Sequence, residues 1–240
     1  MSGSAEAGHH ESRVVHTRFT SRVQGDLAVD LPPDALQARR AAIAPTPWTW
    51  LRQVHGADVV VVTEPGEHAG TAADAAVSAV GGVTLAVHSA DCAPVLLHST
   101  GAGSTVIGAA HAGWRGLRAG VLQRTVEQMR QLGADDVAWR LGPCISPAAY
   151  EFGSDDLEQL RTTLGDAVVA RTATGAPALD LRAGVRAALT AAGASPADPD
   201  QAVDCTATDP SYFSWRARHD RGRQAAVVWT TSARTGGSDS

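Results

Sequence analysis

Three side chains that bind transition metals stand beside glycine-rich turns: His55, Cys92 and His111. Cys92 follows a strand-like apolar run at 82–87, and His111 ends another at 106–110. We expect these two runs to pair as strands, while His55 stands just before a third apolar run. Two histidines and one cysteine leave the fourth position of a tetrahedral zinc ion open for water or substrate. The sequence therefore predicts a catalytic zinc site with three protein ligands.

Each of these residues also has an ordinary interpretation. His55 could lie in a surface turn, and Cys92 could be a small buried hydrophobic residue, which is the commonest role of a free cysteine. The joint pattern with His111 favours metal binding over these separate roles. His88 has the same strand parity as Cys92 and could line the site, although a structural role is the simpler interpretation. The remaining candidates are read as structural or solvated: His98, Cys144, Cys205 and His219.

Composition limits the functional classes. The chain has 240 residues, of which 44% are hydrophobic, and this predicts one core in a single catalytic domain over residues 13–231. The polar tails 1–12 and 232–240 are expected to be disordered. The net charge of -5 with scattered arginines indicates neither nucleic-acid nor membrane binding, and no obligate protein partner is evident. All 20 basic residues are arginine, which excludes a lysine Schiff base and a P-loop.

The expected cellular location follows from the types of apolar segment in the chain and from its number of cysteines. No segment has the pattern of a signal peptide or the roughly 20 apolar residues of a spanning helix, which predicts a cytoplasmic protein. Three cysteines are too few and too odd in number for a disulfide framework, so we expect reduced thiols.

The distribution of apolar residues predicts an α+β fold with a mixed sheet. Helices are expected over 117–132, from Ser154, and from Asp180 to Gly193. The turn-rich segment 98–104 predicts an antiparallel hairpin that brings Cys92 near His111. Runs of strand length occur at 59–62, 83–87, 95–97, 106–110, 137–141 and 225–229. Because strands and helices do not alternate regularly, a doubly wound fold is not expected.

Five motifs occur in an order that resembles the YfiH/YlmD family, once called polyphenol oxidase or laccase-like and now described as purine nucleoside phosphorylases. They are RQVHG at 52–56, SADCAP at 89–94, AHAGWRG at 110–116, LGPCI at 141–145 and FSWR at 213–216. The resemblance implies a single domain with α/β/β/α layers and one zinc ion held by His55, Cys92 and His111. Copper is the less favoured occupant. A further motif, FTSR at 19–22, resembles the family's FTTR but lacks the glycine pair that commonly follows.

The resemblance also implies an activity. It is phosphorolysis of adenosine, inosine, guanosine and methylthioadenosine, with adenosine deamination at the same site. For deamination, zinc lowers the pKa of a water that it binds to roughly 7. Asp74 or Asp91 would then transfer the proton or orient a ligand histidine, and the sequence leaves the choice open. For phosphorolysis, the site must hold a phosphate dianion, and the candidates are Arg22, Arg115 and Arg216.

Rival functions use the same residues. A cysteine hydrolase would use the thiolate of Cys92 with His111 as its base, and bound metal would argue against it. Some bacterial relatives are described as editing peptidoglycan precursors. A multicopper oxidase needs about ten histidines by usual coordination, more than this chain offers outside the tail at 1–12. A structural zinc site normally has four protein ligands, and three are visible here.

Overall fold

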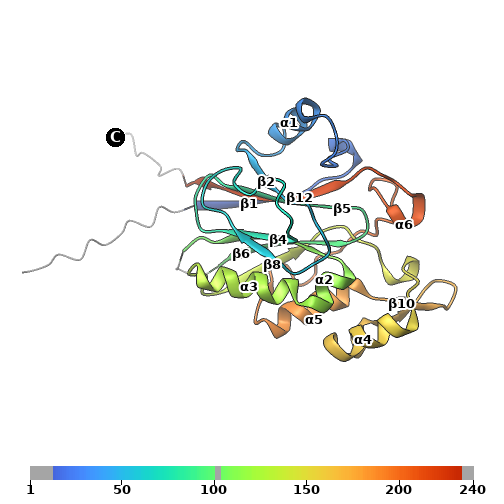
Figure 1. The fold of residues 1–240 in the computed structure, drawn as a ribbon. Coiled ribbons are helices and arrows are strands. Elements are labelled where there is room, and N and C mark those ends of the chain that lie inside the picture. Colours follow the sequence, from blue (N-terminus) through green and yellow to red (C-terminus); the bar gives the residue numbers. More distant parts are fainter. Residues whose placement is uncertain (1–12, 101–103, 234–240) are drawn as a thin grey trace, which may run out of the picture.

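Two β-sheets packed face to face form the centre of the molecule (Figure 1). The structure, a computed structural model, describes residues 13–100 and 104–233. The four-stranded sheet has the order β1-β12-β5-β2 and the six-stranded sheet the order β11-β8-β6-β7-β4-β3. The strands are β1 Arg13–Phe19, β2 Trp48–Trp50, β3 Val59–Val61, β4 Ala75–Ser78, β5 Thr84–Ser89, β6 Ala93–Ser99, β7 Ile107–Ala112, β8 Val137–Leu141, β11 Ser195–Pro196 and β12 Gln224–Ser232.

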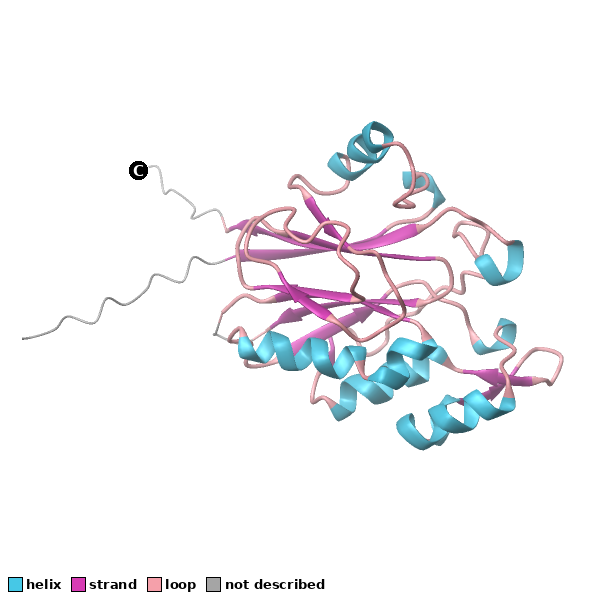
Figure 2. Ribbon diagram, viewed as in Figure 1, coloured by secondary structure: helices cyan, strands magenta, loops and turns pink. Residues whose placement is uncertain are grey.

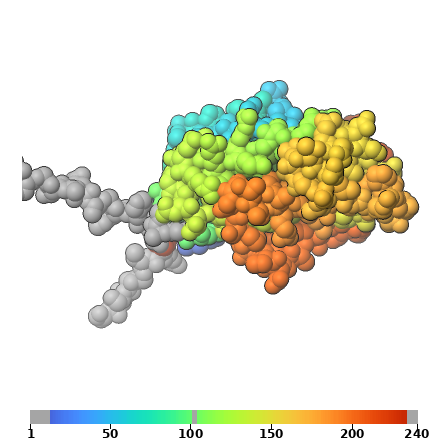
Figure 3. All heavy atoms as spheres, turned by 90° about the horizontal axis from the view of Figure 1, so that it is seen from below, coloured from blue at the N-terminus to red at the C-terminus, as the bar shows by residue number. Residues whose placement is uncertain are grey.

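Helices cover the outer faces of the two sheets (Figure 2). Helix α1 lies over the four-stranded sheet, and α2, α3 and α5 lie over the six-stranded sheet. Figure 3, viewed from the latter side, shows these helical segments covering that face. The α-helices are α1 Pro33–Ala41, α2 Trp114–Ala119, α3 Val121–Gln131, α4 Ser154–Leu164, α5 Leu181–Ala191 and α6 Trp215–Arg218. The expected α+β fold with α/β/β/α layers and mixed sheets is therefore confirmed.

Smaller elements lie on the connections. A two-stranded sheet pairs β9 (Val169–Arg171) with β10 (Pro177–Leu179) near α4. Short 3-10 helices are η1 Arg22–Gln24, η2 Pro147–Ala149 and η3 Asp166–Val168. No helix in the described ranges is long and apolar enough to cross a membrane.

The central strands are buried at every position because both of their faces are covered. Strands β4, β5 and β7 have no exposed residue, and small side chains dominate β7, whose sequence is IGAAHA. Gly108 shows why: a Cβ there would lie 3.1 Å from the sulfur of Met129 in α3. Small residues thus bring α3 close to the sheet. Because both faces of these strands are covered, their sequences are continuous apolar runs and do not alternate between apolar and polar residues.

Two of the connections that cross from one sheet to the other carry candidate ligands. The connection from β2 to β3 contains His55, and the short connection from β5 to β6 contains Cys92. Strand β7 ends nearby, with His111 directly opposite Pro94 of β6. The candidate site therefore lies where the chain passes between the sheets, at the end of β7.

The expected pairing of the runs at 82–87 and 106–110 is wrong. Strand β5 belongs to the four-stranded sheet and β7 to the six-stranded one, because the chain changes sheet between Ser89 and Ala93. The hairpin expectation is confirmed: β6 and β7 are antiparallel neighbours. The hairpin, not direct pairing of the first run, brings Cys92 near His111. Residues 101–103 of its turn lie outside the described residues.

The helices differ from expectation at their boundaries. The single helix expected over 117–132 is two helices, α2 and α3, because Gly120 takes a left-handed conformation with φ of 82° between them. Helix α4 begins at Ser154, but its N-cap is Gly153 and no side chain caps it. Asp180 caps α5 as expected, since its carboxylate accepts a hydrogen bond from the backbone N–H of Ala183 at 2.9 Å.

The first and last strands of the described chain, β1 and β12, lie side by side and pair antiparallel. Arg13 stands opposite Ser232, so residue 232 belongs to the sheet rather than to the expected tail. The rest of the expected tails, 1–12 and 234–240, lies outside the described residues. The sequence prediction did not include β1, β2, β4 or α1, which are short or carry weak periodicity.

Candidate metal centre

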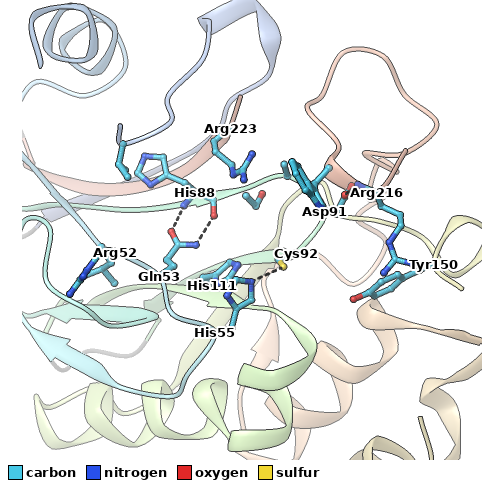
Figure 4. Close-up of a pocket in the computed structure, with 15 residues that line it drawn as sticks. Arg52, Gln53, His55, His88, Asp91, Cys92, His111, Tyr150, Arg216 and Arg223 are labelled. Carbon is cyan, nitrogen blue, oxygen red and sulfur yellow. Dashed lines mark hydrogen bonds between the residues drawn. The ribbon is translucent and has the colours of Figure 1, made fainter. Parts of the chain in front are cut away.

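The three predicted ligands meet in space. The nitrogen and sulfur ligand atoms of His55, Cys92 and His111 all lie within 4.8 Å of one another. Sγ of Cys92 is 3.9 Å from Nε2 of His55, and the two imidazole rings stand edge to face with centroids 4.9 Å apart. A tetrahedral zinc ion separates nitrogen and sulfur ligands by about 3.5 Å. The donor set and its spacing therefore fit one zinc ion with an open coordination position (Figure 4).

A single fully buried carboxylate positions two of these ligands. Oδ1 of Asp74 accepts a hydrogen bond from Nδ1 of His111 at 2.9 Å, which directs the other ring nitrogen toward Cys92. The same carboxylate accepts the backbone N–H groups of Val54, His55 and Gly56 at 3.1, 3.0 and 2.7 Å. These four hydrogen bonds use both carboxylate oxygens, so Asp74 orients the ligands and has no free oxygen to shuttle a proton.

The backbone is strained at two places beside the site. His55 has φ of 60° and Asp91 has φ of 101°, which is a region that side-chain-bearing residues seldom occupy. Hydrogen bonds hold the backbone of both residues in these conformations. The backbone N–H of His55 is held by Asp74, and the carbonyl of Asp91 accepts the N–H of Ile145 at 2.9 Å. Strain of this kind is typical of sites that hold side chains in one required geometry.

Two glycines of the AHAGWRG motif let the loops close over the ligands. A Cβ on Gly113 would lie 2.9 Å from the ring of His55 and 3.2 Å from the sulfur of Cys92. A Cβ on Gly116 would lie 3.0 Å from the carbonyl oxygen of Gly56. Neither position has room for a larger residue, so these glycines are required by close approach and not by φ.

Cys92 and His111 form an interacting acid–base pair. Burial raises the pKa of the Cys92 thiol, but the charge and hydrogen bond of His111 together with those of His55 outweigh it and lower this pKa to about 6. Burial lowers the pKa of His111, yet the thiolate of Cys92 and the hydrogen bond to Asp74 raise it to about 9. Burial also opposes ionisation of Asp74, but its hydrogen bonds hold its pKa below the usual range. The thiolate is the form of cysteine that binds metals.

A pocket of about 520 Å³ opens beside the three ligands. Its volume lies in the range of small-molecule sites, roughly 300–1,000 Å³. Trp215, which is 52% exposed, offers a flat aromatic face at the pocket. The other lining residues include polar and cationic side chains: Arg52, Gln53, His88, Ser89, Asp91, Tyr150, Arg216 and Arg223.

Asp91 anchors the part of the pocket that contains Arg216. Its Oδ2 accepts the backbone N–H of Arg216 at 2.7 Å, and its Oδ1 accepts the hydroxyl of Thr206 at 2.7 Å. The guanidinium of Arg216 lies over the ring of Tyr150, 4.9 Å from its centroid (Figure 4). Burial raises the pKa of Tyr150, so its phenol stays protonated and can donate a hydrogen bond. Unlike Asp74, Asp91 lines the pocket.

The other predicted arginines do not line this pocket. The guanidinium of Arg22 donates to Asp220 at 2.5 Å and to the carbonyl of Tyr212 at 3.2 Å, and lies over the ring of Phe213. Arg115 is exposed and lies over the ring of Trp114, 4.5 Å from its centroid. Of the three arginines predicted to hold phosphate, the structure brings only Arg216 to the pocket.

Several pocket residues had no predicted role. Gln53 belongs to the RQVHG motif, and its amide pairs with the backbone of His88 through two hydrogen bonds of 2.7 Å. Arg52 was visible in the same motif, whereas no sequence signal marks Tyr150 or Arg223. His88, which the sequence allowed as a lining residue while favouring a structural role, is part of the pocket lining. Among the residues interpreted as structural or solvated, Cys144 is buried in the core, Cys205 is half-buried, His98 is half-buried and His219 is exposed.

Comparisons with known proteins agree with the fold and the motifs. Residues 26–231 match the family described as "Multi-copper polyphenol oxidoreductase laccase". A purine nucleoside phosphorylase of Streptomyces coelicolor is 40% identical over 197 residues, covering 81% of this chain and 79% of that protein. The crystal structure of a Neisseria meningitidis protein, NMB0706, has a TM-score of 0.74 at 32% identity and covers 90% of this chain and 93% of its own.

One further solved structure bears on the resemblance to the YfiH/YlmD family. YlmD from Geobacillus stearothermophilus has a TM-score of 0.73 at 26% identity, with 93% of each chain covered. The resemblance to the YfiH/YlmD family is thereby confirmed.

Replacing Asp74 tests the orientation of the ligands. Asp74→Asn keeps the size of the side chain but removes the charge that two ligand-bearing segments share, so we expect metal affinity to fall by about 10–100-fold. Competition with a chromophoric chelator measures the dissociation constant. Asp58→Asn is the matched control, because Asp58 is an exposed carboxylate in the same connection. Equal metal affinity in the Asp74 variant and the wild type would contradict this role.

Replacing Gly113 tests its close contact with the side chains of His55 and Cys92. In Gly113→Ala the added methyl group displaces the ring of His55 or the sulfur of Cys92, and we expect metal affinity to fall about tenfold or more. Gly153→Ala is the control, since its φ is -68° and no atom lies within 4 Å of the new Cβ. Metal analysis after dialysis distinguishes the two variants. A Gly113 variant that retains stoichiometric metal shows that the loop has room to move.

Proposed function

The chain belongs to the family described as multi-copper polyphenol oxidoreductase laccase, and we propose that it is a zinc-dependent purine nucleoside phosphorylase that also deaminates adenosine. One observation carries the proposal. A single pocket of about 520 Å³ joins the metal-ligating residues to an exposed tryptophan and several arginines. The name of the Streptomyces coelicolor relative supports the same activity. The proposed substrates are adenosine, inosine, guanosine and methylthioadenosine.

Phosphorolysis requires the pocket to hold two reactants in contact. An oxygen of hydrogen phosphate forms a bond to the anomeric carbon of the ribose as the bond from that carbon to the purine nitrogen breaks, and the proton of the phosphate ends on the purine. Trp215 gives the purine a surface on which to stack. Because the chain has no lysine, arginines hold the phosphate dianion, and Arg52, Arg216 and Arg223 line the pocket.

Deamination replaces the purine amino group with an oxygen from water. A zinc ion held by His55, Cys92 and His111 would supply a Lewis acid that activates water at neutral pH. Asp91 is the carboxylate that we assign to proton transfer, since it lines the pocket and each of its oxygens accepts one hydrogen bond, whereas each oxygen of Asp74 accepts two. Asp91 would accept a proton from the attacking water and return it to the departing ammonia.

Zinc is favoured over copper by the donor set and the surroundings. The described residues contain one group of side chains with metal-binding spacing, whereas multicopper oxidation needs several copper ions. A trigonal copper site of two histidines and one cysteine usually has a weak axial methionine. The only methionine in the described ranges, Met129, packs against Gly108 inside the core.

A cysteine hydrolase is the second candidate, and one observation favours it. Cys92, His111 and Asp74 form a chain of contacts in which the carboxylate orients the histidine and the histidine lowers the pKa of the thiol. The same arrangement activates nucleophilic cysteines. A peptidoglycan precursor is the substrate class to test for such a hydrolase. Metal dependence separates the two candidates, because a metal-bound thiolate is a poor nucleophile.

Replacing Cys92 tests the metal and the reaction together. We expect wild-type protein to contain about one zinc ion per chain and to consume inosine only when phosphate is present. Cys92→Ala should lose both the metal and the activity, and Cys205→Ala, a half-buried thiol outside the pocket, is the control. Metal analysis and chromatography of hypoxanthine measure the two outcomes. Activity that survives chelation but not thiol alkylation would support the hydrolase instead.

Replacing Arg22 tests the phosphate role predicted from the FTSR motif. The contacts of Arg22 suggest that it positions the segment that carries Arg216, because its partner Asp220 also accepts the backbone N–H of Ser214 at 2.9 Å. We therefore expect Arg22→Ala to lower inosine phosphorolysis and phosphate-free adenosine deamination by similar factors, about tenfold. A selective rise in the Michaelis constant for phosphate would show instead that Arg22 binds phosphate. Arg161→Ala, in an exposed ion pair, is the control.

A further inference from the structure

The pocket contains a tyrosine hydroxyl that no group in the described part of the chain uses. Tyr150 is half-buried and lines the pocket. Its hydroxyl has no hydrogen-bond partner among the described residues, yet it is not enclosed by protein as the unpaired ring nitrogens of His88 are. Figure 4 shows the phenol oxygen on the side of the ring that faces Cys92. Tyr150 therefore presents a free hydroxyl to a ligand in the pocket.

The ring of Tyr150 is held in one orientation by its backbone and by two side chains. Its backbone N–H donates to the carbonyl of Pro147 at 3.1 Å, and its carbonyl accepts the N–H of Leu179 in β10 at 3.3 Å. The ring stands edge to face with that of Phe152, with centroids 5.5 Å apart, and the guanidinium of Arg216 lies over its face. The hydroxyl is thus pre-organised, and little side-chain freedom is lost when a ligand binds it.

The electrostatic surroundings make this phenol a hydrogen-bond donor. Burial raises the pKa of Tyr150, and the charges of Cys92 and Asp91 raise it further, so the hydroxyl keeps its proton. The cation of Arg216 over the ring acts in the opposite direction on this pKa and strengthens the O–H as a donor. The phenol therefore suits a ligand that offers a hydrogen-bond acceptor.

The position of Tyr150 suits the edge of a purine base. Trp215, on which the proposed function stacks the purine, belongs to α6 together with Arg216. Because the guanidinium of Arg216 lies over the ring of Tyr150, the phenol lies beside that stacking surface. The edge of a purine that faces away from the ribose carries N7, which is an acceptor. This nitrogen belongs to the same five-membered ring as the nitrogen bonded to the ribose, so it shares the negative charge when that bond breaks.

We propose that Tyr150 is a catalytic residue that donates a hydrogen bond to N7 of the purine and stabilises the charge on the departing base. The proposal rests on the proposed phosphorylase function and adds a residue to it. As the bond from the ribose carbon to the purine breaks, its electron pair passes into the purine ring and a phosphate oxygen bonds to the carbon. The phenol keeps its proton throughout, and hydrogen phosphate supplies the proton that the free base gains. A donor aimed at developing charge lowers the barrier to the reaction.

Steady-state kinetics with two nucleosides test this role. Tyr150→Phe removes only the hydroxyl, and we expect kcat/KM for phosphorolysis of inosine to fall about tenfold to a hundredfold. In 7-methylinosine a methyl group occupies N7 and the base leaves uncharged, so the same variant should lower its phosphorolysis by less than about threefold. Metal content and the Michaelis constant for phosphate should stay within about twofold of wild type. A merely structural role of Tyr150 would lower the rates for both nucleosides.

Calorimetric titration without phosphate measures the same contact in the absence of phosphorolysis. The two ligands are inosine and 7-deazainosine, in which a C–H group replaces N7. Wild type should bind inosine about fivefold more tightly than 7-deazainosine, and Tyr150→Phe should bind the two equally. Tyr212→Phe is the matched control, because Tyr212 is the only other tyrosine, lies outside the pocket lining and donates its hydroxyl to Asp204 at 2.8 Å. It should keep the preference of wild type for inosine.

The outcomes separate the role of Tyr150 from the proposed function. If wild type phosphorolyses inosine and Tyr150→Phe affects inosine and 7-methylinosine equally, or neither of them, the contact with N7 is overturned and the function stands. A loss confined to adenosine deamination also overturns the contact and places the phenol against the attacking water. If wild type distinguishes the two ligands through Tyr150 but does not cleave inosine with phosphate, the contact stands and the phosphorylase function fails. Absence of both the preference and phosphorolysis overturns both.

Discussion

The site depends on one buried carboxylate. Asp74 is fully buried and joins the connection that carries His55 to the strand end that carries His111 through four hydrogen bonds. Such a group is costly to bury unless each oxygen is paired, and here the pairing itself sets the positions of two candidate metal ligands. The third ligand, Cys92, comes from a separate crossing between the sheets. Close contact of Gly113 with both His55 and Cys92 then completes the arrangement.

The two crossings place the candidate ligands and the pocket at the same end of the molecule. A chain that passes between packed sheets leaves backbone and side chains at the open end of the sandwich, where they meet residues from the segment around α6. One wall of the pocket is the metal-ligating group, and the others are formed by Trp215 with Arg216 and by His88 with Arg223. Side chains from segments distant in sequence therefore line one pocket beside the candidate metal ligands.

The segment around α6 is held by interactions that are themselves distant in sequence. Asp91 accepts the backbone N–H of Arg216, and Asp220 accepts the backbone N–H of Ser214 while pairing with Arg22. Arg22 also lies over Phe213, so an N-terminal motif supports the part of the pocket formed near the C-terminus. Its contacts give Arg22 a positioning role, whereas Arg216 reaches the pocket directly.

Residue types and local patterns in the sequence were sufficient to predict the β6–β7 hairpin, the cap of α5 and the layered α+β class, and to single out three candidate ligands that the fold brings together. These predictions depend on metal-ligand chemistry, turn composition and periodicity, or on motifs that resemble a known family. Each of these signals is contained in a short stretch of sequence. The tertiary structure alone decided which carboxylate orients His111, that β5 and β7 belong to different sheets, and that the buried ring of His88 has no hydrogen-bond partner among the described residues. A hydrogen bond or an unpaired ring depends on residues brought together from distant segments, as Asp74 and His111 are, and no local pattern records which segments will meet.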